Sequence, residues 1–161
     1  MDQDTRLAEL LSSSPTVELD GDTLTITSGS ASITFLDREV ADPDRPLEGT
    51  TWTLDSLVTG DAVSSVPVGV TATFTIVDGR AQVATGCNTG GASVTIGDGT
   101  IEFGPLAHTK MACAAEAMEV ETAVTSVLSG TTTFTIEAGR LTITAATPTT
   151  ATTGLSFTAD R

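Results

Sequence analysis

The sequence predicts a mainly β fold of the α+β class, in which a strongly curved antiparallel sheet, or a small open barrel, packs against one inserted helix. Three observations indicate this fold. Threonine and apolar residues alternate along short runs such as residues 71–77, and β-branched residues suit the pleated, half-buried surface of a strand. Acidic glycine turns such as Asp78-Gly79 join consecutive runs as hairpins. Residues 115–129, in contrast, carry apolar side chains at helical spacing.

The first elements of the chain are a short helix and three strands. Leu7, Leu10 and Leu11 lie three and four residues apart, which predicts one apolar helix face. Two alternating runs follow, with the turn at residues 20–22 between them, which is typical of a hairpin. A charged segment with two prolines then indicates a linker. The predicted bounds are a helix at 2–12, strands at 16–20, 23–27 and 31–36, and a linker at 39–46.

Residues 47–161 predict a complete domain of strands with one helix. Gly97-Asp98-Gly99 provides a further hairpin turn, and Gly130 suits the C-terminal cap of the helix at 115–129. The predicted strands lie near 70–77, 80–85, 91–96, 100–103, 132–137, 140–145 and 154–159.

One set of apolar residues should form the core of this domain, because alternation along the strands and helical spacing place them on inner faces. Trp52 is most simply a core anchor rather than a ring that stacks on a ligand. The set comprises Trp52, Leu54, Phe74, Ile76, Phe103, Leu106, Val124, Val127, Leu128, Phe134, Ile136, Leu141, Ile143 and Phe157.

The composition excludes several classes of partner. The formal net charge of −14 argues against nucleic acid, whose phosphates require clusters of Lys and Arg, and against anionic membrane surfaces. No stretch of 18 apolar residues occurs, so the sequence predicts no membrane-spanning segment. The length suits one domain with a core, or one domain plus a fragment.

An internal repeat organises the chain. Residues 1–27 match residues 118–144 at a constant offset of 117 without a gap. The sequence therefore predicts that residues 1–38 are the C-terminal half of a first repeat and that residues 47–161 are a whole second one. Asp2, Asp4 and Glu9 oppose a signal peptide at this N-terminus. Either the protein is cytosolic or an upstream part is missing, and a repeat that begins in mid-unit favours the second interpretation. The matched pairs include Met1 with Met118, Asp4 with Glu121, Leu7 with Val124, Leu24 with Leu141, Ile26 with Ile143, and Asp37-Arg38 with Asp160-Arg161.

The first half repeat should lack a partner for its apolar faces, since a piece below about 40 residues cannot normally fold alone. Residues 1–38 and 114–161 then compete for one front half, residues 47–112. We expect residues 114–161 to pack with residues 47–112, which gives the ordinary domain. If residues 1–38 pack with residues 47–112 instead, the result is a circular permutant. The spare half should extend a sheet edge or cover an apolar patch, on its own unit or in a strand-exchanged homodimer.

Three segments of the second unit together resemble the META domain of HslJ-like bacterial proteins. They are residues 47–54 with an early Trp52, the Gly-Cys-Asn turn at 86–91, and the Thr-x-Met-x-Cys motif at 109–113. The resemblance implies structural roles for Trp52, Gly86, Asn88, Gly91, Thr109 and Met111. It also implies an envelope-associated or secreted protein, often a lipoprotein, with a link to stress responses, and it implies no enzymatic activity.

The only two cysteines, Cys87 and Cys113, occupy positions of this family pattern. They are interpreted as a disulfide or as paired buried thiols. A disulfide would stabilise the fold by about 3 kcal/mol through loop closure, and an exported setting favours it. Free cysteine is also commonly buried.

The remaining polar motifs predict no catalytic residue, no metal site and no cofactor. His108, the only histidine, lacks enough N or S neighbours in sequence for structural zinc. The acidic glycine turns lack the carboxylate spacing of a calcium loop. Residues 86–91 lack the lysine and the following helix of a phosphate loop. Asn88 is instead expected to bond to nearby main chain, with the glycines allowing a tight passage of the backbone.

The sequence thus predicts a non-enzymatic, extracytoplasmic META-type domain with a structural or protein-binding role in the bacterial envelope. The alternative is a protein that binds a small ligand or a lipid tail in a pocket between the curved sheet and the helix. No particular protein or small molecule is indicated as the partner.

Overall fold

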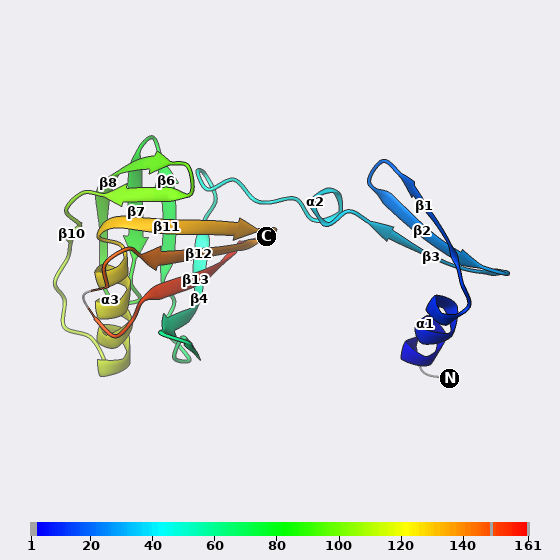
Figure 1. The fold of residues 1–161 in the computed structure, drawn as a ribbon. Helices are drawn as coiled ribbons and strands as arrows, with labels where there is room; N and C mark the ends of the chain where they lie inside the picture. The colour runs from blue at the N-terminus through cyan, green and yellow to red at the C-terminus, as the bar shows by residue number, and fades with distance from the viewer. Residues whose placement is uncertain (1–2, 149, 161) are drawn as a thin grey trace. The chain divides into compact units, whose positions relative to one another are not determined.

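The computed structural model describes residues 3–148 and 150–160 (Figure 1). The chain divides into two compact units, Met1–Pro43 and Asp44–Arg161. Met1, Asp2 and Arg161, which take part in the predicted helix and in the repeat pairs, lie outside the described residues.

The second unit is a closed antiparallel β-barrel. Eight strands follow one another around it in the order β8-β7-β6-β4-β13-β12-β11-β9, and β9 pairs back onto β8. Two short strands are attached to this ring, with β5 on β4 and β10 on β8. The ring strands are β4 (Trp52–Thr59), β6 (Thr73–Val77), β7 (Arg80–Ala84), β8 (Thr89–Gly97), β9 (Thr100–Phe103), β11 (Gly130–Glu137), β12 (Arg140–Ala145) and β13 (Gly154–Ala159), and the attached ones are β5 (Ala62–Ser65) and β10 (Ala107–His108).

The predicted fold class is confirmed, and the barrel is closed rather than open. Closure depends on β9, because this short strand pairs with β8 on one side and with β11 on the other. A closed barrel leaves no unpaired strand edge in the ring.

The barrel interior and the helix α3 (Ala115–Val127) share one apolar core. From α3, Val120, Val124 and Val127 join this core, and each is at most 1% exposed. The predicted core is confirmed: eleven of its fourteen residues are buried. The other three, Leu106, Phe134 and Ile136, are partly buried and pack against the same cluster.

The first unit is a helix and a three-stranded antiparallel sheet with little buried surface. The strand order is β1-β2-β3, and every residue of β1 is exposed. Leu10 is buried, whereas Leu19 is 71% exposed. The elements are α1 (Gln3–Ser12), β1 (Thr16–Asp20), β2 (Thr23–Ser28), β3 (Ala31–Leu36) and a short α2 (Arg38–Ala41).

The strand β4 and three short elements were not predicted from the sequence. The helix α2 begins with Asp37, whose side chain accepts a hydrogen bond from Glu39 N, as an N-terminal cap does. The strands β5 and β10 have four and two residues, too few for an alternating pattern to stand out.

A chain that begins at Asp44 should fold as a monomer, with a thermal midpoint within about 3 °C of that of the barrel in the whole protein. The reason is that the barrel core begins at Leu47, while Asp44 Oδ1 and Arg45 N bond to the backbone of Ala138. Calorimetry and sedimentation check this outcome.

A chain that begins at Glu48 is the matched control. It loses Leu47, whose carbonyl accepts the Trp52 indole N–H at 3.2 Å, and its midpoint should fall well below that of the longer variant. Unfolding or aggregation of the chain that begins at Asp44 would contradict the division into two units.

Candidate functional site

The predicted Gly-Cys-Asn motif forms a tight turn between β7 and β8. Thr85 N–H donates to the Asn88 carbonyl at 2.8 Å, and Asn88 N–H donates to Thr85 Oγ1 at 3.1 Å. Gly86 has φ +85°, and a Cβ there would lie 2.5 Å from Val70 Cγ1. Both conditions require glycine at this position.

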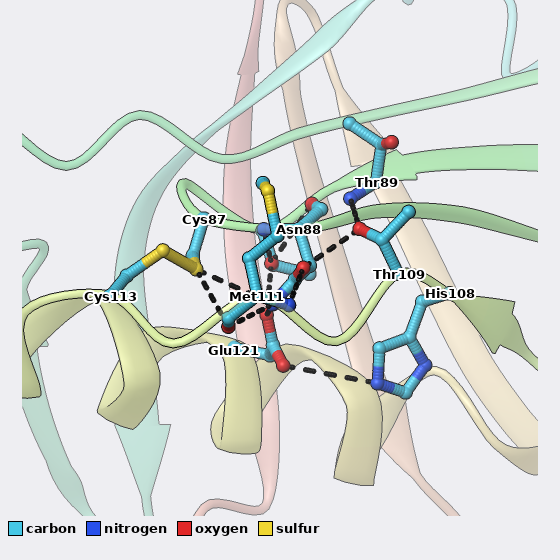
Figure 2. Close-up of a disulfide and its surroundings, with 9 residues drawn as sticks. Cys87, Asn88, Thr89, His108, Thr109, Met111, Cys113 and Glu121 are labelled. Atoms are coloured by element: carbon cyan, nitrogen blue, oxygen red, sulfur yellow. Dashed lines mark hydrogen bonds and ion pairs between the residues drawn. A yellow bond between two sulfur atoms is a disulfide. The ribbon is translucent and has the colours of Figure 1, made fainter.

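Asn88 is the centre of a buried hydrogen-bond network (Figure 2). Its Oδ1 accepts from Thr109 Oγ1 at 2.7 Å and from Met111 N at 2.8 Å. Its Nδ2 donates to the Met111 carbonyl at 3.1 Å and to Glu121 Oε2 at 2.8 Å. These four bonds match the two donors and two acceptor sites of an amide side chain, and Nδ2 also contacts Cys87 Sγ at 3.3 Å. Asn88 is only 1% exposed.

A disulfide between Cys87 and Cys113 lies beside this network (Figure 2), and the two Cα atoms are 6.0 Å apart. Since Asn88 follows Cys87 directly and Met111 precedes Cys113 by two residues, the covalent link and the hydrogen bonds hold the same two segments together. The segment that enters α3 is thereby fixed to the turn before β8. We call Thr85, Cys87, Asn88, Thr109, Met111, Cys113 and Glu121 the Asn88 network.

Glu121 is the charged member of the Asn88 network. It lies on the inner side of α3 and is 7% exposed, and Thr85 Oγ1 donates to its Oε2 at 2.8 Å. Desolvation raises the pKa of this carboxyl. Hydrogen bonds from Asn88 and Thr85, together with the nearby His108, lower the pKa by more than desolvation raises it. The pKa of Glu121 therefore lies below the ordinary value of 4.5. The folded protein therefore holds Glu121 as a carboxylate.

His108 faces the other oxygen of this carboxylate. His108 Nε2 lies 3.8 Å from Glu121 Oε1 (Figure 2), and the imidazole side chain is 24% exposed. This distance suits an ion pair when the histidine is protonated and is too long for a direct hydrogen bond.

Two further glycines allow strands to approach closely next to the Asn88 network. A Cβ at Gly90 would lie 2.4 Å from the Ala107 carbonyl of β10, and one at Gly91 would lie 2.7 Å from the Ala81 carbonyl of β7. The predicted motif residue Gly91 thus serves strand packing, because a side chain there would require the backbone to move.

The structure places the predicted site residues in two locations. Cys87, Asn88, Thr109, Met111 and Cys113 come together in the Asn88 network, with Gly86 and Gly91 beside it. Trp52 lies instead in the barrel core, fully buried. Met111 contributes through its main chain, since its side chain is 58% exposed.

Sequence reasoning missed Thr85 and Glu121 as site residues. A signal for Glu121 was present, because this carboxylate lies on the same helix face as Ala117 and Val124, four residues before it and three after it. A charged residue on a buried helix face normally has a partner. Nothing local marked Thr85 as that partner.

The polar groups of the Asn88 network bond to one another inside the protein. Among residues 3–148 and 150–160, no group of three or more His, Cys, Asp or Glu side chains is placed to hold a metal ion. Within the same residues, no buried polar side-chain atom lacks a hydrogen-bond partner. No helix in the described part of the chain is long and apolar enough to cross a membrane.

The second unit is a small closed barrel that shares its core with one helix, and a disulfide and a buried asparagine fix the segment that enters this helix. The META domain family matches residues 45–156, more than half of the chain, and the chain belongs to this family. The resemblance inferred from the sequence is thus confirmed for the second unit. No curated protein matches the sequence.

Two solved structures resemble the chain. An NMR structure of a protein from Burkholderia xenovorans is 25% identical, with a TM-score of 0.58 over 71% of this chain and 83% of that one. A second NMR structure is 20% identical, with a TM-score of 0.52 over 70% of this chain and 90% of that one. The second likeness is one of fold alone.

Glu121→Gln should lower the free energy of unfolding at pH 7 by about 2 kcal/mol, because charge-assisted hydrogen bonds to a carboxylate are lost. Since the pKa of Glu121 is lower in the folded state, its carboxylate stabilises the protein above pH 4.5, and this contribution disappears as the pH falls through the folded pKa. The gap between the parent and the variant should therefore narrow in acid. Urea unfolding over a pH series measures it.

Glu119→Gln is the matched control, because Glu119 lies on the same helix and is exposed. This variant should stay within about 0.5 kcal/mol of the parent. A Glu121→Gln variant as stable as the parent at pH 7, or a gap that does not change with pH, would contradict the assigned role of Glu121.

Proposed function

We propose that this protein is a non-enzymatic, extracytoplasmic META domain protein with a structural or protein-binding role in the bacterial envelope, linked to stress responses. The proposal rests on how the motif residues of the family are bonded in this protein. Asn88, Thr109 and the Met111 main chain bond to one another inside the protein. None of these groups is left to act on a substrate, which supports a role in stability rather than in catalysis.

The disulfide supports the extracytoplasmic part of the proposal. Disulfides persist in oxidising compartments and are rare in the cytosol. The bond between Cys87 and Cys113 closes a loop with a sequence separation of 26, for which loop closure predicts a stabilisation of about 3 kcal/mol. In the cytosol the two cysteines would be kept reduced, and the protein would lose this stabilisation.

We further propose that residues 1–38 are the C-terminal half of a first META repeat, which precedes the complete second one. The pairing register of the two regions supports it. Val17 pairs with Ile26 and Ile26 with Ile33 in the first unit. Their repeat counterparts Phe134, Ile143 and Leu155 pair in the same order in the second unit.

The alternative is a protein that binds a small ligand or a lipid tail between the sheet and α3. That role requires an apolar cavity at this interface, but Val120, Val124 and Leu128 fill it and are at most 1% exposed. A groove of about 340 Å³ lies beside α3 on the side of residues 150–152 instead, lined by Met118 and Thr122 among others. The packing of the interface therefore favours the structural or protein-binding role.

In cells that express the full-length native gene, neither cysteine should react with a membrane-permeant maleimide before reduction, and both should react after it. The protein should fractionate with the envelope or the medium. Mass spectrometry of the trapped protein reads out both cysteines. Cys113→Ser is the matched control, since it leaves Cys87 as a single thiol that should react without reduction. Two reactive thiols in a cytosolic fraction would overturn the extracytoplasmic proposal.

A further inference from the structure

One face of the sheet in the first unit carries a grid of six apolar side chains. Val17, Ile26 and Ile33 lie opposite one another on the three strands, and so do Leu19, Leu24 and Phe35. Residues two apart on a strand share a face, so the two rows lie side by side. We call these six residues the β1–β3 apolar face.

Three of the six side chains of this face are exposed to solvent, and the other three are partly buried. Val17 is 63% exposed, Leu19 71% and Phe35 45%. Within the described residues, β1 and β3 pair only with β2, so each keeps one unpaired edge. An apolar sheet face with two free edges is typical of a surface that binds another polypeptide.

The second unit shows what covers the corresponding face. Its two rows are Phe134, Ile143, Leu155 and Ile136, Leu141, Phe157, paired in the same register. Phe157 contacts the ring of Phe74 from β6, with centroids 5.8 Å apart. The outer edges are also occupied, because β11 pairs with β9 and β13 pairs with β4.

We propose that the β1–β3 apolar face and α1 form a docking surface for a META-type front half. Such a segment is equivalent to residues 44–113 and lacks its own α3 and β11–β13. The proposal rests on the half repeat proposed above. The occupant supplies apolar side chains for the face and two strands for the free edges, as β4 and β9 do in the second unit.

The helix of the first unit fits the same occupant. Leu7, Leu10 and Leu11 match Val124, Val127 and Leu128, which are fully or almost fully buried in the barrel core. In the first unit, Leu7 is 38% exposed and Leu11 is 51% exposed. Leu7 and Leu11 of α1 are therefore exposed and available for contact with the occupant, whereas their counterparts Val124 and Leu128 are enclosed in the core of the second unit.

The carboxylate of the Asn88 network also has a counterpart. Asp4 occupies the repeat position of Glu121, and it lines a groove of about 700 Å³ between α1 and β3 together with Leu7, Ile33 and Phe35. A docked front half brings an asparagine equivalent to Asn88, whose Nδ2 donates to the Glu121 carboxylate in the second unit and requires an acceptor when it is buried. Asp4 provides that acceptor with a side chain one methylene shorter.

The test adds a separate polypeptide of residues 44–113 to the full chain and measures binding by calorimetry and sedimentation. A one-to-one complex is expected, with amide protection gained in residues 16–36 by NMR. Val17→Thr with Leu19→Thr should weaken binding by at least about tenfold, because these side chains are exposed until they are covered.

Glu18→Thr is the matched control, since Glu18 lies between the two substituted residues on the same strand and points to the opposite face. It should leave the affinity within about twofold. Failure to bind, equal binding by the double variant, or a homodimer of the full chain through residues 1–38 would each overturn the proposal.

NMR of the free chain separates the two proposals. Cross-strand contacts between Val17 and Ile26 and between Ile26 and Ile33 report the half-repeat register without any partner. If these contacts are absent, both the half repeat and the docking surface are wrong. If they are present and the added segment does not bind, only the docking surface is wrong.

Discussion

The barrel depends on the buried amide of Asn88 and the four hydrogen bonds that it makes to Thr109, Met111 and Glu121. They join the turn before β8, the segment that enters α3, and the helix itself through Glu121. A buried polar group that loses its partners costs about 1–3 kcal/mol, so each member of the Asn88 network makes the loss of another more costly. The disulfide between Cys87 and Cys113 adds a covalent constraint to the same two segments.

The position of α3 follows from this attachment. The helix supplies Val120, Val124 and Val127 to the apolar core, and nothing but residues 104–114 connects it to β9 on its N-terminal side. Residues 109 and 111 of this connection bond to Asn88. Only residues 112–114 then lie between this attachment and the start of α3. The Asn88 network thus fixes where the helix begins, and the apolar contacts fix which face it buries.

Local patterns predicted most of the strands and the core, because period-two alternation and β-branched composition are read from neighbouring residues. Closure of the barrel was not predicted, since it depends on the pairing of β9 with β11, which are separated by α3 in sequence. The motif residues were recognised through the family resemblance, but the main-chain role of Met111 and the part of Glu121 were not. The helical spacing of Glu121 with Ala117 and Val124 marks it as a carboxylate on a buried face, but its partners Thr85 and Asn88 and the bonds of the Met111 main chain are contacts between distant segments that no local pattern encodes.

Native-state hydrogen exchange of the Met111 amide, which donates to Asn88 Oδ1, tests most directly whether the Asn88 network is integral to the barrel. This amide is expected to exchange only when the whole barrel unfolds, with the same opening free energy as the amides of β12. Exchange of Met111 through a local opening, at least about a hundredfold faster while β12 stays protected, would contradict it. In that case the barrel would be stable without the Asn88 network.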